Sequence, residues 1–239
     1  MFEIACGLVV KGGKEFIDKW KNNIPLFDMI FVIDNGADKE VKEALMNNCK
    51  VKQYLMQNTY RNSSRDYQKL LNMAREEKCK WIWMVDIDEE IIGTSNQQIK
   101  EFLINNNDES GAFPLVEMRN DENHYVTYRG KDARGCHKVF KPLSHFKYDL
   151  EDTHGSAIPP NCNLGNVIPI LIKHYGHMTK EMREKKRKQY IEFIKKNKNE
   201  NDVLELEQVW FKEELGENDE IRDINELIQR MKERNEISK

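Results

Sequence analysis

The chain has 239 residues, of which 39% are hydrophobic and 33% are charged. This length fits one sizeable α/β domain with a helical appendage, and the composition excludes an intrinsically disordered chain. Lys and Arg total 38 and Asp and Glu total 41, a formal net charge of -3, so the whole molecule has no electrostatic attraction for nucleic acid or for an anionic membrane.

The sequence shows no signal for membrane insertion, secretion or disulfide formation. No apolar stretch approaches the roughly 20 residues of a membrane-spanning helix, and residues 1–16 lack the pattern of a signal peptide. The five cysteines are widely separated and never form a Cys-x-x-Cys pair, which argues against a disulfide framework and a zinc site. We therefore expect a cytoplasmic protein with reduced thiols and no integral membrane segment.

The first third of the chain alternates apolar runs with amphipathic stretches, which is the pattern of β-α-β units with a parallel sheet. The expected strands span residues 3–10, 29–33, 51–55 and 81–85. The expected helices span residues 14–23, 39–47 and 64–75. A doubly wound, Rossmann-like sheet follows from this alternation.

The second half has a different texture. Beyond residue 110, short alternating runs separated by turn residues predict antiparallel or mixed sheet. From Thr179 to the end there is no proline, and apolar residues from Ile221 to Met231 recur at helical spacing. We expect a domain of residues 1–178 followed by a helical extension of residues 179–239. The last helix is expected to pack against the core or, alternatively, to form a homodimer contact.

An acidic run follows the most aromatic strand. The segment WIWMVDIDEE places Asp86, Asp88 and Glu89 directly after an apolar strand. Side-chain alternation along a strand predicts both aspartates on one side, at the carboxyl edge where open α/β sheets bind ligands. Two such carboxylates can flank Mn²⁺ or Mg²⁺, which neutralises charge on a leaving diphosphate. The alternative is a solvated acidic turn, because Asp-x-Asp is a common pattern.

In WMVDIDEE the sequence resembles the family 2-like glycosyltransferases of the GT-A fold, in the branch with an Asp-x-Asp-Glu metal motif. FVIDNGAD resembles the second-strand nucleotide motif, SSRDYQKLLNMA the arginine-led helix, HKVFKPL the later strand and IKHYGH the closing histidine motif. The resemblance covers most of residues 1–190. It implies a GT-A mixed sheet flanked by helices, and metal-dependent transfer of a sugar from a nucleotide-sugar donor, with UDP favoured, to a hydroxyl of a glycan, lipid or protein acceptor, with inversion.

The resemblance also implies a nucleotide-binding set. Asp34, with Asn35, is expected to contact the nucleoside, although an aspartate at this position can instead cap its turn. Arg65 is expected beside the base or the phosphates, where a guanidinium forms hydrogen bonds. Asp86 is expected to contact both the donor and the metal.

A metal and base set is implied in the same way. Asp88 and His174 are expected to hold the cation together with Asp86, and His154 is a further candidate ligand. Glu151 and Asp152 are candidates for the general base that deprotonates the acceptor hydroxyl, with Asp152 preferred. The alternative for these two acids is a charged surface loop.

The basic segment that begins at Lys180 is expected to be a helix. Its first cations, Lys180, Arg183 and Lys185, could fold over the diphosphate as a lid, or they could form a solvated face. Two other functions remain open for the chain. A metal-dependent nucleotidyltransferase or phosphoesterase could use the same acids, and a non-catalytic nucleotide-sugar-binding module could share the fold.

Overall fold

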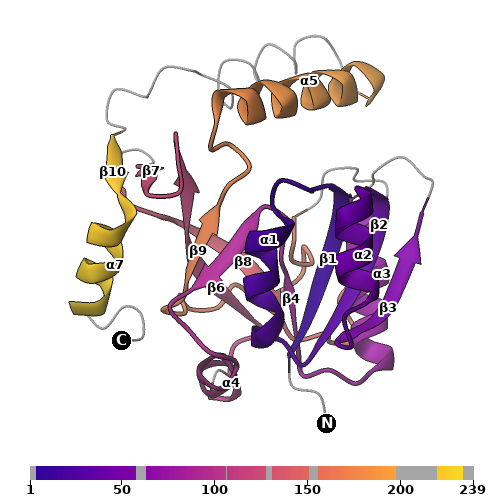
Figure 1. The fold of residues 1–239 in the computed structure, drawn as a ribbon. Coiled ribbons are helices and arrows are strands. Elements are labelled where there is room, and N and C mark those ends of the chain that lie inside the picture. Colours follow the sequence, from indigo (N-terminus) through magenta and orange to yellow (C-terminus); the bar gives the residue numbers. More distant parts are fainter. Residues whose placement is uncertain are drawn as a thin grey trace.

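The structure, a computed structural model, describes residues 4–57, 63–105, 107–127, 131–150, 156–197 and 220–233. In these ranges it contains one mixed sheet of ten strands, flanked by helices (Figure 1). The predicted α/β class, with a Rossmann-like mixed sheet, is confirmed. No helix in the described ranges is long and apolar enough to cross a membrane.

One half of the sheet is parallel, in the strand order β3-β2-β1-β4. Its strands are β1 (Ile4–Gly12), β2 (Met29–Ala37), β3 (Val51–Met56) and β4 (Trp81–Met84). The helices that connect them are α1 (Ile17–Trp20), the 3₁₀ helix η1 (Lys21–Leu26), α2 (Lys39–Met46) and α3 (Ser63–Glu76). The helix expected at residues 14–23 is therefore shorter and continues as a 3₁₀ turn, because Pro25 has no N–H for an α-helical hydrogen bond.

The apolar side chains of the parallel strands pack on both faces of the sheet. Residues of β1 such as Leu8 pack on α1 and α2 in one cluster, whereas Ala5 of the same strand packs on α3 in another. This alternation explains the uninterrupted apolar run of β1, because both of its faces are buried. The carboxyl ends of these strands are left as the polar edge of the sheet.

The other half of the sheet is mixed. Its elements are β5 (Glu89–Ile92), α4 (Asn96–Ile104), β6 (Ser110–Met118), β7 (His124–Val126), β8 (Arg134–Phe140) and β9 (Leu171–His174). Strand β8 joins the two halves by antiparallel pairing with β4 and β6, and β6 also pairs in parallel with β9. The expected change to mixed sheet beyond residue 110 is confirmed. Ser95 begins α4 with a capping box that Gln98 completes.

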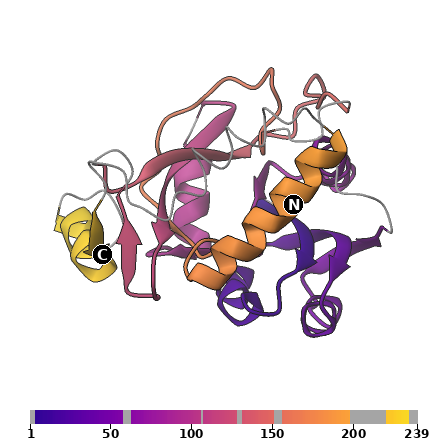
Figure 2. The same cartoon turned by 90° about the horizontal axis from the view of Figure 1, so that it is seen from above.

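The chain after residue 179 contains both helices and a strand. Helix α5 (Lys180–Asn197) lies over the end of the sheet at which β1, β2 and β4 finish (Figures 1 and 2). Strand β10 (Ile221–Asp223) pairs with β7, and α7 (Ile224–Glu233) follows it directly. Helix was predicted from Ile221 onward, which is wrong for β10 because pairing with an open sheet edge overrides helical periodicity over three residues.

The last helix packs against the core, as expected. Ile224, Leu227 and Met231 are buried in a cluster that also contains Met118 and Tyr125. The division of the chain at residue 178 remains a prediction, and β10 joins residues beyond it to the main sheet.

Candidate active site

The two aspartates of the acidic run lie in a turn rather than on a strand. Strand β4 ends at Met84, and the chain turns through Asp86, Ile87 and Asp88 before β5 begins at Glu89. Alternation along a strand therefore does not apply, and the aspartates have different partners. The geometry on which a shared cation between Asp86 and Asp88 was predicted is absent from this turn.

Asp88 lies beside the histidine of the closing motif. Its Oδ2 is 3.3 Å from Nε2 of His174, and only 7% of Asp88 is exposed. The sheet registers produce this contact, because His174 of β9 pairs with Glu89 of β5 on one side and with Glu117 of β6 on the other. The predicted neighbourhood of Asp88 and His174 is confirmed.

Glu117 supports the other ring nitrogen of His174. Its Oε2 contacts Nδ1 of His174, and its Oε1 accepts a hydrogen bond of 2.6 Å from Nη2 of Arg134. A carboxylate on Nδ1 fixes both the orientation and the tautomer of an imidazole whose Nε2 faces a ligand. Arg134, Glu117, His174 and Asp88 thus form one chain of alternating charge.

The charges in this chain stabilise one another. Burial lowers the pKa of His174, but the carboxylates of Glu117 and Asp88 outweigh burial and raise the pKa to about 10. Burial raises the pKa of Glu117, whereas His174 and Arg134 bring it down to about 2. Burial also raises the pKa of Asp88, but Lys186 and His174 hold it well below its ordinary value. At neutral pH the imidazolium therefore lies between two carboxylates.

A pH prediction follows from the raised pKa of His174. The stabilisation is fully present below the unfolded pKa of about 6.5 and is lost as pH rises through the folded pKa of about 10. The protein should lose up to about 2.7 kcal/mol of unfolding free energy from this group between pH 7 and pH 9, the limit for one proton. Urea denaturation of wild type and His174→Gln at both pH values measures it. An equal loss in the two proteins would exclude His174 as the source.

Lys186 and Gly176 complete the surroundings of Asp88. Nζ of Lys186, on α5, lies 2.8 Å from Oδ2 of Asp88. A Cβ added to Gly176 would overlap the Asp88 carboxylate, the Lys186 ammonium and Nε2 of His174. Gly176 therefore leaves open the space between an acid, an imidazole and an ammonium group.

Asp86 belongs to a separate ion cluster. Lys138 of β8 is 7% exposed, and its Nζ lies 2.5 Å from Oδ2 of Asp86 and 2.6 Å from Oε1 of Glu89. The second oxygen of Glu89 accepts a hydrogen bond from the backbone N–H of Asp86. Burial lowers the pKa of Lys138, but these two carboxylates raise it well above its ordinary value. The side chain of Asp86 is 36% exposed, so one side of it faces solvent.

The predicted nucleoside residues lie at the end of β2. Oδ1 of Asp34 accepts from the N–H groups of Gly36 and Ala37, and Oδ2 accepts from the Tyr54 hydroxyl at 2.9 Å. Nζ of Lys42 is a further partner at 3.3 Å. The structure shows Asp34 capping its turn, which was the alternative considered beside nucleoside recognition.

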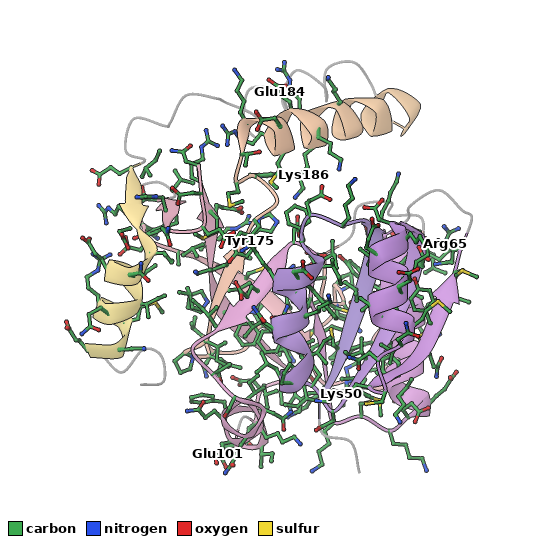
Figure 3. All side chains as sticks on the ribbon, viewed as in Figure 1. Lys50, Arg65, Glu101, Tyr175, Glu184 and Lys186 are labelled. Carbon is green, nitrogen blue, oxygen red and sulfur yellow. The ribbon has the colours of Figure 1, made fainter. Side chains whose placement is uncertain are left out.

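Asn35 follows Asp34 in the chain, and it contacts the helix that carries Arg65. Nδ2 of Asn35 donates to Asp66 of α3 at 2.7 Å, which joins the end of β2 to the helix that carries Arg65. Oδ1 of Asn35 is buried and has no hydrogen-bond partner among the residues that the structure describes. Figure 3 shows Arg65 on the α3 side of the molecule and Lys186 below α5.

Several predicted site residues lie outside the described ranges, and the structure places at the site some residues that the sequence did not identify. Glu151, Asp152 and His154 lie outside the residues that the structure describes, so the general base and the second histidine stay predictions. The site residues that sequence reasoning did not single out are Glu117, Lys138, Gly176 and Lys186. An isolated acid in the apolar run PLVEM was the available signal for Glu117, because a buried carboxylate needs a partner.

The donor set fits a divalent cation at Asp88 and His174. A carboxylate oxygen and a supported imidazole Nε2 converge beside Gly176, and one or two protein ligands suffice when phosphate oxygens and water supply the rest. Within the described ranges, no three His, Cys, Asp or Glu side chains are grouped as a complete metal site. Asp86 has a different partner from Asp88, since its Oδ2 lies 2.5 Å from Nζ of Lys138.

Two open cavities lie among the described residues. One of about 300 Å³ is lined by Pro114, Arg134 and Leu227, and one of about 360 Å³ lies beside Trp81 and Lys141. Neither includes Asp88, since Lys186 and α5 cover that carboxylate.

Comparison with known proteins gives no family assignment. No family model matches the chain, and no curated protein matches its sequence. Among solved structures, TarS of S. aureus in a form spanning its residues 1–349 with UDP-GlcNAc shares 11% identity at a TM-score of 0.49, over 87% of this chain and 73% of that one. The same form with UDP shares 10% identity at a TM-score of 0.48, over 86% and 71%. Another TarS structure shares 11% identity at a TM-score of 0.45, and this chain spans 88% of its own length and 44% of that chain. At these identities and TM-scores, the matches assign neither a family nor an activity.

Proposed function

We propose that this chain is a metal-dependent glycosyltransferase that transfers a sugar from a nucleotide-sugar donor, with UDP favoured, to an acceptor hydroxyl with inversion. The observation that carries the proposal is the meeting of Asp88, from the turn after β4, with His174, whose far nitrogen Glu117 supports. Asp88 and His174 lie far apart in the sequence. The sheet brings them together at the carboxyl edge, where open α/β sheets bind nucleotides.

Asp88 and His174 hold Mn²⁺ or Mg²⁺ in this proposal, and a carboxylate with a neutral imidazole is a suitable pair of ligands. The bound cation supplies charge neutralisation for the departing diphosphate. His174 must lose its proton to act as a ligand, so binding releases a proton. Glu117 and Arg134 keep the ring in place before and after that change.

The donor's nucleoside would extend along the same edge toward the end of β2. Oδ1 of Asn35, which has no partner within the described ranges, can accept from a base imide or a ribose hydroxyl, and Arg65 can reach the base or the phosphates. In this proposal the exposed part of the Asp86 side chain contacts the donor, while Lys138 holds one of its oxygens. Asp152 or Glu151 is the proposed base that deprotonates the acceptor hydroxyl.

A thermal-shift panel tests the proposal. Nucleoside diphosphates are added singly, with and without Mn²⁺, because a ligand that binds only the native state raises the melting temperature. We expect one of them, UDP first, to raise it by roughly 5–10 °C at a concentration 100-fold above Kd, and only when Mn²⁺ is present. No shift with any nucleotide and metal would contradict the proposal. A metal-dependent shift without turnover of any UDP-sugar would favour a non-catalytic binding module.

A further inference from the structure

Helix α5 directs Lys186 toward the site and leaves the neighbouring Lys185 exposed. It crosses above the carboxyl edge of the parallel strands in both views (Figures 1 and 2). Figure 3 shows Lys186 pointing from α5 toward the sheet and Glu184 pointing away from it. The side chain of Lys186 is 27% exposed, whereas that of its neighbour Lys185 is 60% exposed. The lysine of α5 that contacts Asp88 is therefore Lys186, which was not among the expected lid residues Lys180, Arg183 and Lys185.

The ammonium of Lys186 lies beside the carboxylate oxygen that would hold a metal in the proposed function. Nζ of Lys186 lies 2.8 Å from Oδ2 of Asp88, and Nε2 of His174 lies 3.3 Å from the same oxygen. Gly176 borders the same small volume, since a Cβ there would overlap all three groups. Lysine is a compact point charge on a flexible stem, so it can fill a cation position and leave it again.

We infer that Asp88, His174 and Gly176 form a cation-exchange site, which the chain's own Lys186 fills in the nucleotide-free protein and which a divalent cation enters by displacing it. The inference rests on the proposed function, because it concerns the same acid. The displaced ammonium remains on α5, above the site, where it is a point-charge partner for the donor's diphosphate. One lysine thus links metal entry to donor binding.

Two thermodynamic consequences follow. Mn²⁺ alone binds weakly, because binding includes displacement of an internal competitor. A nucleoside diphosphate that captures the displaced Lys186 strengthens Mn²⁺ binding, and by reciprocity Mn²⁺ strengthens nucleotide binding by the same factor.

The test is an electron paramagnetic resonance titration of free Mn²⁺ with the full chain, first without nucleotide and then with UDP. Lys186→Met should lower the Kd for Mn²⁺ about ten-fold without nucleotide, since the competitor is gone. The same variant should lose most of the strengthening that UDP gives to wild type. Loss of structure cannot produce tighter metal binding, so this readout separates displacement from a role in folding.

Lys185→Met is the matched control. It removes the same charge from the adjacent position of α5. Nζ of Lys185, however, lies 2.9 Å from Oε1 of Glu15 and does not pair with Asp88. Its Kd for Mn²⁺ should stay within about two-fold of wild type. An equal gain in both lysine variants would overturn the exchange, because the effect would then be one of net charge.

Gly176→Ala gives an independent variant. The added methyl group occupies the space that Lys186 or a metal needs, and Gly176 has an ordinary φ that alanine tolerates. We expect its Mn²⁺ affinity to fall while Lys186→Met gains affinity. Mn²⁺ binding that Lys186→Met leaves unchanged or weakens overturns the exchange and leaves the proposed function standing. Absence of Mn²⁺ binding in wild type and in Lys186→Met overturns both.

Discussion

Asp88→Asn is expected to remove the Mn²⁺-dependent thermal shift and to lower sugar transfer by about 10³-fold or more, because several kcal/mol of charge stabilisation at the leaving diphosphate depend on the cation. The substitution replaces one charged ligand oxygen by a neutral amide of nearly the same shape. Lys186 and His174 then lose their shared anion. The measurements are the thermal-shift panel and the release of nucleoside diphosphate from the donor.

Asp121→Asn is the control for this variant. Asp121 also pairs with a histidine, since its Oδ1 lies 2.8 Å from Nδ1 of His124, but the pair is exposed on the β6–β7 turn. Both variants should remain folded by circular dichroism, and Asp121→Asn should keep wild-type transfer. Full transfer activity in Asp88→Asn would exclude Asp88 as a metal ligand, whatever its neighbours are.

The strand pattern of the first half of the chain was predictable because its signals are local. The apolar runs of β1, β2 and β4 are buried on both faces, so their composition alone indicates parallel strands between helices. Strand β10 was not predictable, because three residues carry too little periodicity and depend on an open edge elsewhere in the fold. The helix expected at residues 14–23 is α-helical only over Ile17–Trp20 and continues as a 3₁₀ helix, because Pro25 has no N–H for an α-helical hydrogen bond.

The site was predictable where a motif stood at the end of a strand. Asp88 and His174 each follow an apolar run, and their juxtaposition was expected from the order of the motifs. The partners of Glu117 and Lys138 were not predictable, because they depend on the register of β6 with β9 and of β8 with β4. Nothing in a lysine-rich sequence marks Lys138 as a lysine that the fold buries.

Lys138→Met is expected to cost about 3–5 kcal/mol of unfolding free energy, the usual effect of removing one partner of a buried ion pair. Lys138 is buried, and its removal leaves Glu89, which is 2% exposed, without its main counter-charge. Asp86 loses the same partner, but its side chain is partly exposed and water can take over. Urea denaturation with a constant m-value measures the loss.

The chain offers both a control and a rescue for this change. Lys147→Met removes an exposed lysine elsewhere in the chain and should change stability by no more than about 0.5 kcal/mol. Lys138→Met combined with Glu89→Gln should recover part of the loss, because a neutral amide no longer needs a buried cation. If the double variant is as unstable as Lys138→Met alone, lost packing of the lysine stem accounts for the effect instead of an uncompensated charge. Recovery would show that Lys138 stabilises the protein by neutralising Glu89. The turn that carries Asp86 and Asp88 would then keep its conformation whether Lys186 or a divalent cation contacts Asp88.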